Sequence, residues 1–281
     1  MLRRNARHLG QQLATLSLGA VAALGIVAAR FIPEHQRTGP VVTAAASLVG
    51  GSGVLPARRT GTDSAAMRPA SLLTTEVASA LGALASGVRQ TSHPQALEDA
   101  FRSYFAYHAA HPDTKPYLYF VDYGLPSTTP RGYVFDMAAL RVVDGPFAVA
   151  HGRGSSETQY GVPTRFSNAS GSEATSLGLY VAQELYAFRG HAGGGTYNSV
   201  GLRLAGVSDG FNENARARRV VAHGAPYVTE TKAGRSEGCP ALEPSRAERL
   251  LPKLANGGLV FLFAPDPAWM TGDPWLTARA G

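Results

Sequence analysis

The chain of 281 residues contains one cysteine, Cys239, in the run Arg-Ser-Glu-Gly-Cys-Pro at positions 235–240. One cysteine cannot form an internal disulfide, so its thiol is either an inert buried group or a nucleophile. The glycine before it lets the backbone approach a substrate closely and present N–H groups, as an oxyanion hole requires. This setting favours the nucleophile, although free cysteines are often buried.

His223 is the candidate general base. It ends a predicted strand and precedes Cys239 by sixteen positions, a separation that allows the chain to fold back on itself. A free thiol has a pKa of about 8.5 and is only a few per cent ionised at pH 7. An imidazole within hydrogen-bond reach can take the thiol proton and later return it to a leaving amine. The backbone N–H groups of Gly238 and Cys239 would stabilise the tetrahedral oxyanion.

The helices and strands that must position these residues are predicted to form one domain over 72–275. Its fold class is α+β, mainly β, and residues 72–112 form a helical lead-in. Apolar residues at helical spacing predict helices over 74–88, 94–111 and 244–255, and the aromatic stripe of the second helix is expected to pack in the core. The Asp-Gly-Pro run at 144–146 is expected to be a break between strands. The predicted strands are 117–123, 132–136, 147–151, 200–204, 219–223 and 258–263. Residues 175–188 fit a strand or a helix, and Gly178 within them favours the strand.

The net charge of +6 comes from the N-terminal part of the chain. Residues 1–60 contain seven arginines and one glutamate, and the basic and acidic residues of the remaining chain balance. The predicted domain is therefore close to neutral and lacks the basic footprint of a nucleic-acid-binding protein.

Residues 1–32 are predicted to be a signal peptide or a membrane anchor. Three arginines precede an uncharged apolar stretch at 13–29, which is long for a signal core and slightly short for a membrane span of about 20 residues. Small residues at 27–29 have the spacing of a cleavage site. Both alternatives place the bulk of the protein outside the cytoplasm, in the periplasm or cell envelope. Residues 33–71, rich in Ala, Gly, Ser, Thr and Pro, are predicted to be a flexible linker.

A series of motifs over roughly residues 115–265 resembles the murein L,D-transpeptidase catalytic-domain family. Each motif alone is only weakly specific for the family. Their order and spacing along the chain together make the resemblance strong. They are DYGLPS at 122–127, HGRGS at 151–155, RFSN at 165–168, SLG at 176–178, FNENAR at 211–216, HGA at 223–225 and GRSEGCPA at 234–241.

The resemblance implies a peptidoglycan enzyme with mixed β-sheets or a β-sandwich, a few peripheral helices, and no metal or diffusible cofactor. Such enzymes attack a tetrapeptide stem after the L-centre of diaminopimelate, expel D-alanine and hold the stem as a thioester. An amine on a second stem or on a lipoprotein then accepts it, commonly giving a 3→3 cross-link, whereas water would give a carboxypeptidase. By this resemblance Cys239 is the nucleophile, His223 the general base, and Gly238 part of the oxyanion loop. Acylation by a carbapenem is also implied.

The nucleophile motif indicates a divergent branch of this family. The best-known members have histidine before the Gly-Cys pair and arginine two or three positions after it, whereas this chain has Glu237 before Gly238 and Pro-Ala-Leu after Cys239. Arg235 either replaces that arginine or caps a turn, and His151 either lines the substrate groove or is a structural histidine. The candidate substrate-binding residues are His151, Arg235, Ser236, Gly224, Ser167 and Asn168.

Three other functions are less consistent with these residues. A zinc peptidase or amidase could use His151, His191 and His223 as ligands, but the sequence has no paired-histidine zinc motif, and His191 falls in a predicted glycine-rich loop. A catalytically silent wall-binding module would make Cys239 structural. A papain-type protease would place its cysteine before its histidine, the reverse of the order found here. The peptidoglycan stem is the expected partner, with membrane contact only through the N-terminal segment.

Overall fold

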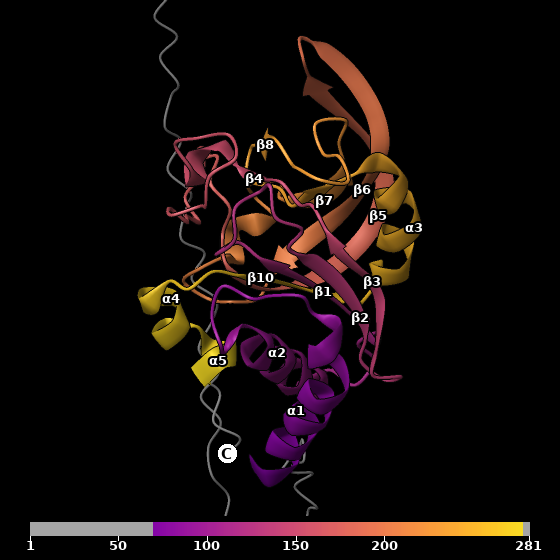
Figure 1. The fold of residues 1–281 in the computed structure, drawn as a ribbon, viewed down its shortest axis with the longest axis vertical. Coiled ribbons are helices and arrows are strands. Elements are labelled where there is room, and N and C mark those ends of the chain that lie inside the picture. Colours follow the sequence, from indigo (N-terminus) through magenta and orange to yellow (C-terminus); the bar gives the residue numbers. More distant parts are fainter. Residues whose placement is uncertain (1–69, 278–281) are drawn as a thin grey trace, which may run out of the picture. The chain divides into compact units, whose positions relative to one another are not determined.

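The protein is described by a computed structural model that covers residues 70–277, so the predicted signal or anchor lies outside the described residues (Figure 1). The predicted linker lies outside them too, apart from its last two residues, which begin α1. None of the helices within 70–277 combines the length and the apolar composition that crossing a bilayer requires. The helices are α1 (Ala70–Leu84), α2 (Ala96–Ala110), α3 (Pro244–Leu254), α4 (Pro267–Gly272) and α5 (Pro274–Thr277), with short 3-10 turns η1 (Ala85–Gly87), η2 (Arg153–Ser155) and η3 (Glu213–Ala215).

A mixed eight-stranded sheet, in the order β3-β2-β1-β10-β5-β6-β7-β9, is the centre of the described domain. Its neighbours run antiparallel except for β1 with β10 and β7 with β9, which are parallel. A small sheet pairs β4 with β8. The strands are β1 (Tyr117–Asp122), β2 (Gly132–Asp136), β3 (Arg141–Phe147), β4 (His151–Gly152), β5 (Gly178–Ala192), β6 (Gly195–Gly206), β7 (Val221–Gly224), β8 (Arg235–Ser236), β9 (Ala241–Leu242) and β10 (Leu259–Phe263).

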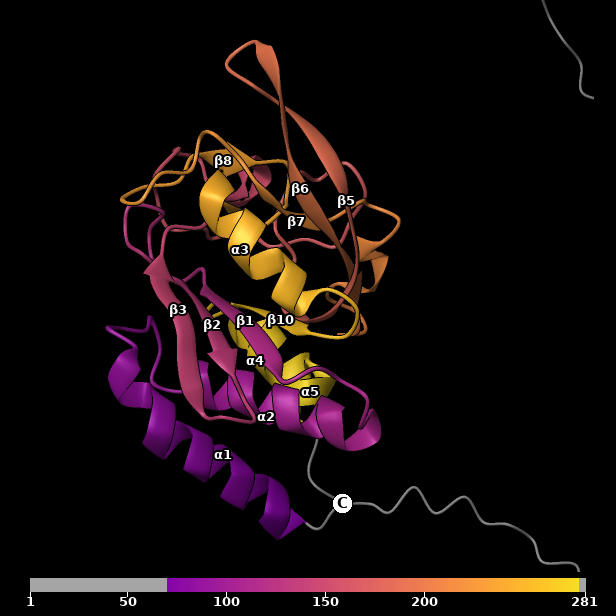
Figure 2. The ribbon, with the colours of Figure 1, turned by 90° about the vertical axis from the view of Figure 1, so that its right-hand side faces the viewer.

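Helices cover the sheet where its strands are most apolar. Every residue of β2 and β10 is buried, as expected for strands covered on both faces. Helices α1 and α2 lie along one side of β1–β3, and α3 crosses the other side near β7 (Figure 2). The predicted aromatic stripe of α2 is confirmed as core, because Phe101 is fully buried and meets Phe135 of β2 edge to face, with 5.4 Å between ring centroids. The apolar stripe of α3 is buried at Ala247, Leu250, Leu251 and Leu254.

The β5–β6 hairpin extends well beyond the other strands (Figure 1). Its antiparallel register runs from Tyr180 opposite Gly206 to Ala192 opposite Gly195. Gly193 and Gly194 form the turn with φ of 58° and 79°, left-handed values that a two-residue hairpin turn requires and glycine accepts without strain. The prediction of a glycine-rich loop around His191 is therefore wrong, because His191 lies within β5 and only the two glycines turn.

A second correction concerns residues 141–151. The Asp-Gly-Pro run predicted to be a break lies inside β3, where Gly145 has φ of 140° and any Cβ would come within 2.5 Å of the Tyr133 ring. Shifts in the register of β2 with β3 show that the strand continues through an irregularity here. The predicted strand at 147–151 is also wrong. Phe147 is the last residue of β3, and the buried apolar residues 148–150 carry the chain from β3 to β4, with an isolated bridge between Ala150 and Ala241.

Asp122 joins the helical lead-in to the sheet. Its carboxylate, at the end of β1, accepts hydrogen bonds from the backbone N–H and the hydroxyl of Ser92, both at 2.6 Å, and from the Gly124 N–H at 3.0 Å. The side chain is almost completely buried. One carboxylate therefore satisfies three donors that would otherwise be left without partners beside the core.

We expect Asp122→Ala to lower the free energy of unfolding by roughly 2–3 kcal/mol, because it leaves buried donors unsatisfied. Chemical denaturation monitored by circular dichroism measures this loss. Asp209→Ala is the matched control, since Asp209 is exposed, and should change stability by less than about 0.5 kcal/mol. Equal stabilities for the two variants would contradict the role assigned to Asp122.

Candidate active site

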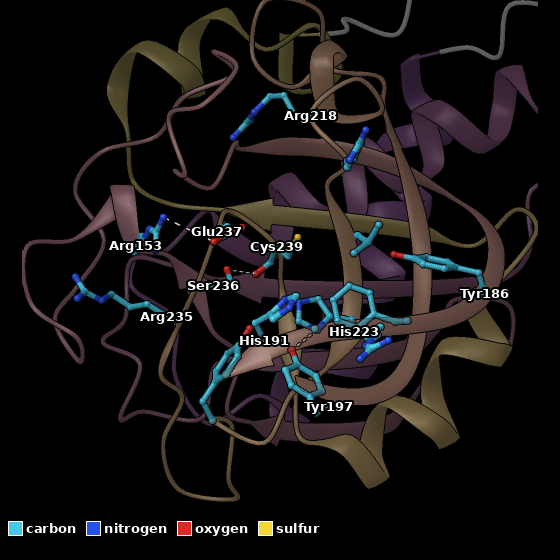
Figure 3. Close-up of a pocket in the computed structure, with 16 residues that line it drawn as sticks. Arg153, Tyr186, His191, Tyr197, Arg218, His223, Arg235, Ser236, Glu237 and Cys239 are labelled. Carbon is cyan, nitrogen blue, oxygen red and sulfur yellow. Dashed lines mark hydrogen bonds and ion pairs between the residues drawn. The ribbon is translucent and has the colours of Figure 1, made fainter. Parts of the chain in front are cut away.

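A cleft of about 480 Å³ lies between β5, the ends of β6 and β7, and the loop that leads into β9 (Figure 3). Aromatic side chains from the hairpin and Tyr227 form part of its wall. Its charged lining is strongly unequal, with five arginines and one carboxylate, that of Glu237. The arginines are Arg153, Arg189, Arg218, Arg219 and Arg235.

Cys239 and His223 both line this cleft. Strands β7 and β9 pair in parallel, with His223 opposite Ala241, and Cys239 precedes Ala241 by two residues. The register of one strand pair therefore brings Cys239 and His223 to the same edge of the sheet. Cys239 is partly exposed, whereas the side chain of His223 is 3% exposed. Figure 3 draws the Cys239 sulfur and the His223 ring in the same hollow.

The His223 ring is held in one orientation. Its Nδ1 is 3.1 Å from the carbonyl oxygen of Gly224 and 3.5 Å from the hydroxyl of Tyr197. Because a carbonyl only accepts, Nδ1 carries the proton and Nε2 is the basic nitrogen. Phe188 stacks on the imidazole with 4.2 Å between centroids. Burial lowers the pKa of His223 to about 4, against a smaller opposing effect of the Gly224 carbonyl, so the ring is neutral near pH 7.

The thiol is also neutral before reaction. Burial, with a smaller contribution from the charge of Glu237, raises the pKa of Cys239 to about 11. The Val221 backbone N–H and the Arg218 guanidinium act in the opposite direction with smaller effect. The pair is therefore a neutral thiol beside a neutral imidazole, and not a preformed thiolate–imidazolium pair. Proton transfer must accompany nucleophilic attack, which is general-base catalysis.

The loop that carries Cys239 is closed by Ser236. The Ser236 hydroxyl donates to the Cys239 carbonyl at 2.7 Å and accepts from the Gly238 N–H at 3.2 Å. Gly238 has φ of 115°, and a Cβ there would lie 2.9 Å from the Ala174 carbonyl oxygen, so only glycine fits. Because Ser236 occupies the Gly238 N–H, only the Cys239 N–H of the two predicted oxyanion donors has no acceptor among the described residues.

Residues 88–263 match the family described as the L,D-transpeptidase catalytic domain, which is well over half of the chain. The chain belongs to this family. No curated protein matches the chain.

Solved structures of L,D-transpeptidases are also similar, at low identity. An L,D-transpeptidase from Mycobacterium smegmatis shares 15% identity and a TM-score of 0.32, with 53% of this chain and 59% of that chain covered. The LD transpeptidase LdtMt1, solved in complex with imipenem, shares 14% identity with a TM-score of 0.33 and the same coverage. The L,D-transpeptidase from Xylanimonas cellulosilytica shares 12% identity and a TM-score of 0.30, with 56% and 68% covered. The match thus spans less than two thirds of the first two chains.

Three of the predicted substrate-binding residues of this L,D-transpeptidase domain lie at the cleft or behind it. Arg235 and Ser236 line the cleft, and Arg235 donates to the carbonyl oxygens of Ser156 at 3.0 Å and Glu157 at 3.4 Å. Gly224 does not line it but accepts the Nδ1 proton of His223. A Cβ on Gly224 would collide with the Ser199 hydroxyl, so the glycine lets β7 pack closely at this point.

His151 is placed away from the cleft. The ring is fully buried, and its Nδ1 lies 2.9 Å from the guanidinium of Arg131, itself fully buried. Burial, followed by the charges of Arg131 and Arg235, lowers the pKa of His151 to about 3. Of the two alternatives for His151, this geometry fits the structural histidine.

Ser167 and Asn168 line a separate hollow of about 230 Å³ beside Phe211 and Trp269. The Ser167 carbonyl accepts from Arg218 at 2.8 Å, and the Asn168 side-chain oxygen accepts from the Asn214 N–H at 3.1 Å. Ser167 therefore supports a residue of the cleft, Arg218, whereas Asn168 is hydrogen-bonded to Asn214, which is not among the described residues that line the cleft.

The zinc alternative finds no support in the arrangement of its three histidines. Within residues 70–277, no three His, Cys, Asp or Glu side chains gather as the ligands of a metal ion would. His191 and His223 reach the same cleft, but His151 does not.

The sequence pattern missed several residues that build the L,D-transpeptidase cleft. Arg218 is half-buried and donates to the carbonyl oxygens of Ser167 and Ala174 at 2.8 and 2.7 Å. Tyr197 and Phe188 of the hairpin contact the His223 ring. The alternating aromatic residues of 186–188 and the Tyr at 197 were available as a signal, whereas Arg218 sits in an arginine-rich run with nothing to single it out.

The rate at which iodoacetamide alkylates Cys239 tests whether the thiol and the His223 imidazole are both neutral before reaction. A thiol with a pKa of about 11 is ionised to only about one part in ten thousand at pH 7. The rate should therefore rise about tenfold per pH unit from about pH 7 to 10, and His223→Ala should keep this steep profile. A plateau of fast alkylation between about pH 5 and 8, lost in His223→Ala, would instead reveal a thiolate–imidazolium pair.

Proposed function

We propose that this protein is an exported cell-envelope L,D-transpeptidase that uses Cys239 as its nucleophile and acts on tetrapeptide stems of peptidoglycan. The observation that carries the proposal is the His223 ring, whose Nδ1–H is fixed on the Gly224 carbonyl. That bond leaves a neutral, basic Nε2 in the cleft that Cys239 also lines. Membership of the L,D-transpeptidase catalytic-domain family supports the same reaction class.

Acylation follows from this geometry. The Cys239 sulfur attacks the carbonyl carbon at the L-centre of diaminopimelate while His223 Nε2 accepts the thiol proton. The Cys239 N–H donates to the oxyanion of the tetrahedral intermediate. As the intermediate collapses, the carbon–nitrogen bond breaks, and the imidazolium gives its proton to the nitrogen of D-alanine. The stem remains on the enzyme as a thioester, and His223 is neutral again.

Deacylation by an amine uses the same groups in reverse. The neutral imidazole takes a proton from the attacking amine, the carbon–sulfur bond breaks, and the proton returns to the thiolate. An amine on a second stem or on a lipoprotein would give a cross-link or an attachment. Water in the same place would give an L,D-carboxypeptidase, and without any acylation the domain would be a silent wall-binding module.

The charge of the cleft supports a stem peptide as substrate. Stem peptides carry several carboxylates, and the cleft presents five arginines. Arg189 and Arg219 are exposed and have no carboxylate partner among the described residues, so they are free to bind an anionic ligand. One L,D-transpeptidase was solved in complex with imipenem, and we extend that class of ligand, a carbapenem, to this cysteine.

Intact-protein mass spectrometry with a tetrapeptide-stem muropeptide and an acceptor tests the proposal. A mass adduct on Cys239 with release of D-alanine and formation of a cross-linked dimer is the expected result. Release without a dimer would favour the carboxypeptidase. A folded protein with a titratable thiol that gives neither adduct nor release would be a wall-binding module.

Two variants assign the roles. Cys239→Ala should abolish formation of the acyl-enzyme, by stem or by carbapenem, without unfolding the domain. His223→Ala should slow acylation by about 10²–10⁴-fold, as expected when a general base is lost. Stopped-flow or quenched mass spectrometry gives both rates. Wild-type acylation in His223→Ala would remove His223 from the mechanism.

A further inference from the structure

Glu237 is the one carboxylate among the described residues that line the cleft. It lies two positions before the nucleophile, and two residues of chain span at most about 7 Å. Glu237 and the thiol therefore lie in the same cleft, which an acceptor must enter to reach a thioester on Cys239. Figure 3 shows it beside Cys239 at the edge of the cleft.

The carboxylate of Glu237 is only loosely held. Its contact with the protein is an ion pair of 3.7 Å to Arg153, longer than a hydrogen bond, and its side chain is 76% exposed. Arg153 is bound more closely by Glu173, which takes both the Nε and a terminal nitrogen of the guanidinium. Glu237 is thus free to turn toward a ligand, while Arg153 keeps its other partner.

For acylation, this carboxylate is unfavourable. Its charge raises the pKa of Cys239 and so opposes formation of the thiolate. A negative charge two residues from the nucleophile is therefore favourable only in a step other than thiolate formation. The second step of the proposed reaction supplies one, because its acceptor arrives as an ammonium ion in a cleft with five arginines, which repel it.

Resting on the proposed function, we propose that Glu237 binds the acceptor amine as an ammonium ion and so favours aminolysis of the thioester over its hydrolysis. The ammonium loses one proton to solvent beside the exposed carboxylate and becomes the nucleophile. It attacks the thioester carbonyl, the carbon–nitrogen bond forms, and the carbon–sulfur bond breaks. Its second proton passes through His223 Nε2 to the departing Cys239 thiolate. The net reaction of thioester and ammonium gives amide, thiol and one released proton.

The partition of the acyl-enzyme between amide and acid tests this role. Both products come from the same thioester, so any effect of Glu237 on acylation cancels in their ratio. The acceptors are a stem peptide with a free diaminopimelate side-chain amine, which is cationic at neutral pH, and hydroxylamine, which is mainly uncharged there. Mass spectrometry of the products gives the ratio, and the intact mass of the full-length protein reports the adduct on Cys239.

Glu237→Gln should lower the amide-to-acid ratio for the cationic amine roughly two- to fivefold, as expected for an exposed ion pair, and leave the hydroxylamine ratio unchanged. Glu237→Asp, which keeps the charge, should restore part of the loss. Glu230→Gln is the matched control, because Glu230 is an exposed carboxylate that does not line the cleft, and it should change neither ratio.

An unchanged ratio for the cationic amine in Glu237→Gln, an equal fall with both acceptors, or the same fall in Glu230→Gln would each overturn the inference while leaving the acyl-enzyme in place. Absence of any adduct on Cys239 in the wild-type protein would overturn the proposed function, and this inference with it.

Discussion

The parallel pairing of β7 with β9 is the constraint on which the site depends. It sets His223 opposite Ala241 and Gly224 opposite Leu242, so that the two residues before β9 must fall beside the imidazole. Helix α3 follows β9 and buries its apolar face against this part of the sheet, which fixes the register from behind. The close packing at Gly224 belongs to the same arrangement, since a larger residue there would meet both Ser199 and Pro244. Core packing and catalytic geometry are therefore one constraint.

The electrostatic environment of the cleft follows from how its cations are held. Arg218 is half-buried and bound by carbonyl and hydroxyl oxygens, with no carboxylate partner within the described residues. Its charge is therefore compensated only by dipoles, and burial lowers its pKa. Such a cation near a neutral thiol gains most when negative charge develops on sulfur or on the oxyanion. Oxygen atoms of the loop 167–176, which folds around the guanidinium, accept its hydrogen bonds and so offset the loss of water around the buried charge.

The sequence predicts those parts of the fold and site that depend on residues close together in the chain. It does not predict those that depend on contacts between distant residues. Apolar runs and helical spacing identify most elements of the large sheet, because those patterns are local, and β10 and α3 are found within a residue or two. Strands β8 and β9 are two residues long and have no periodicity to read. Cys239 and His223 line one cleft, and their motifs and separation in the sequence are sufficient to single them out. The sequence leaves two alternatives open for His151, because its buried contact is with Arg131, twenty residues away, and no local pattern marks that contact.

The same distinction applies within the cleft. Ser236 acts on its own loop, through bonds to Gly238 and Cys239, and such a local role is visible in a Ser-x-Gly-Cys motif once the loop is known to turn. Arg218 acts on residues 42 to 51 positions away, and its neighbours Arg216 and Arg219 have the same side chain but different surroundings. Residue type cannot separate the three arginines, whereas burial and the acceptors they meet do. The residues that give a family its chemistry can thus be read from sequence more readily than those that set the electrostatics around it.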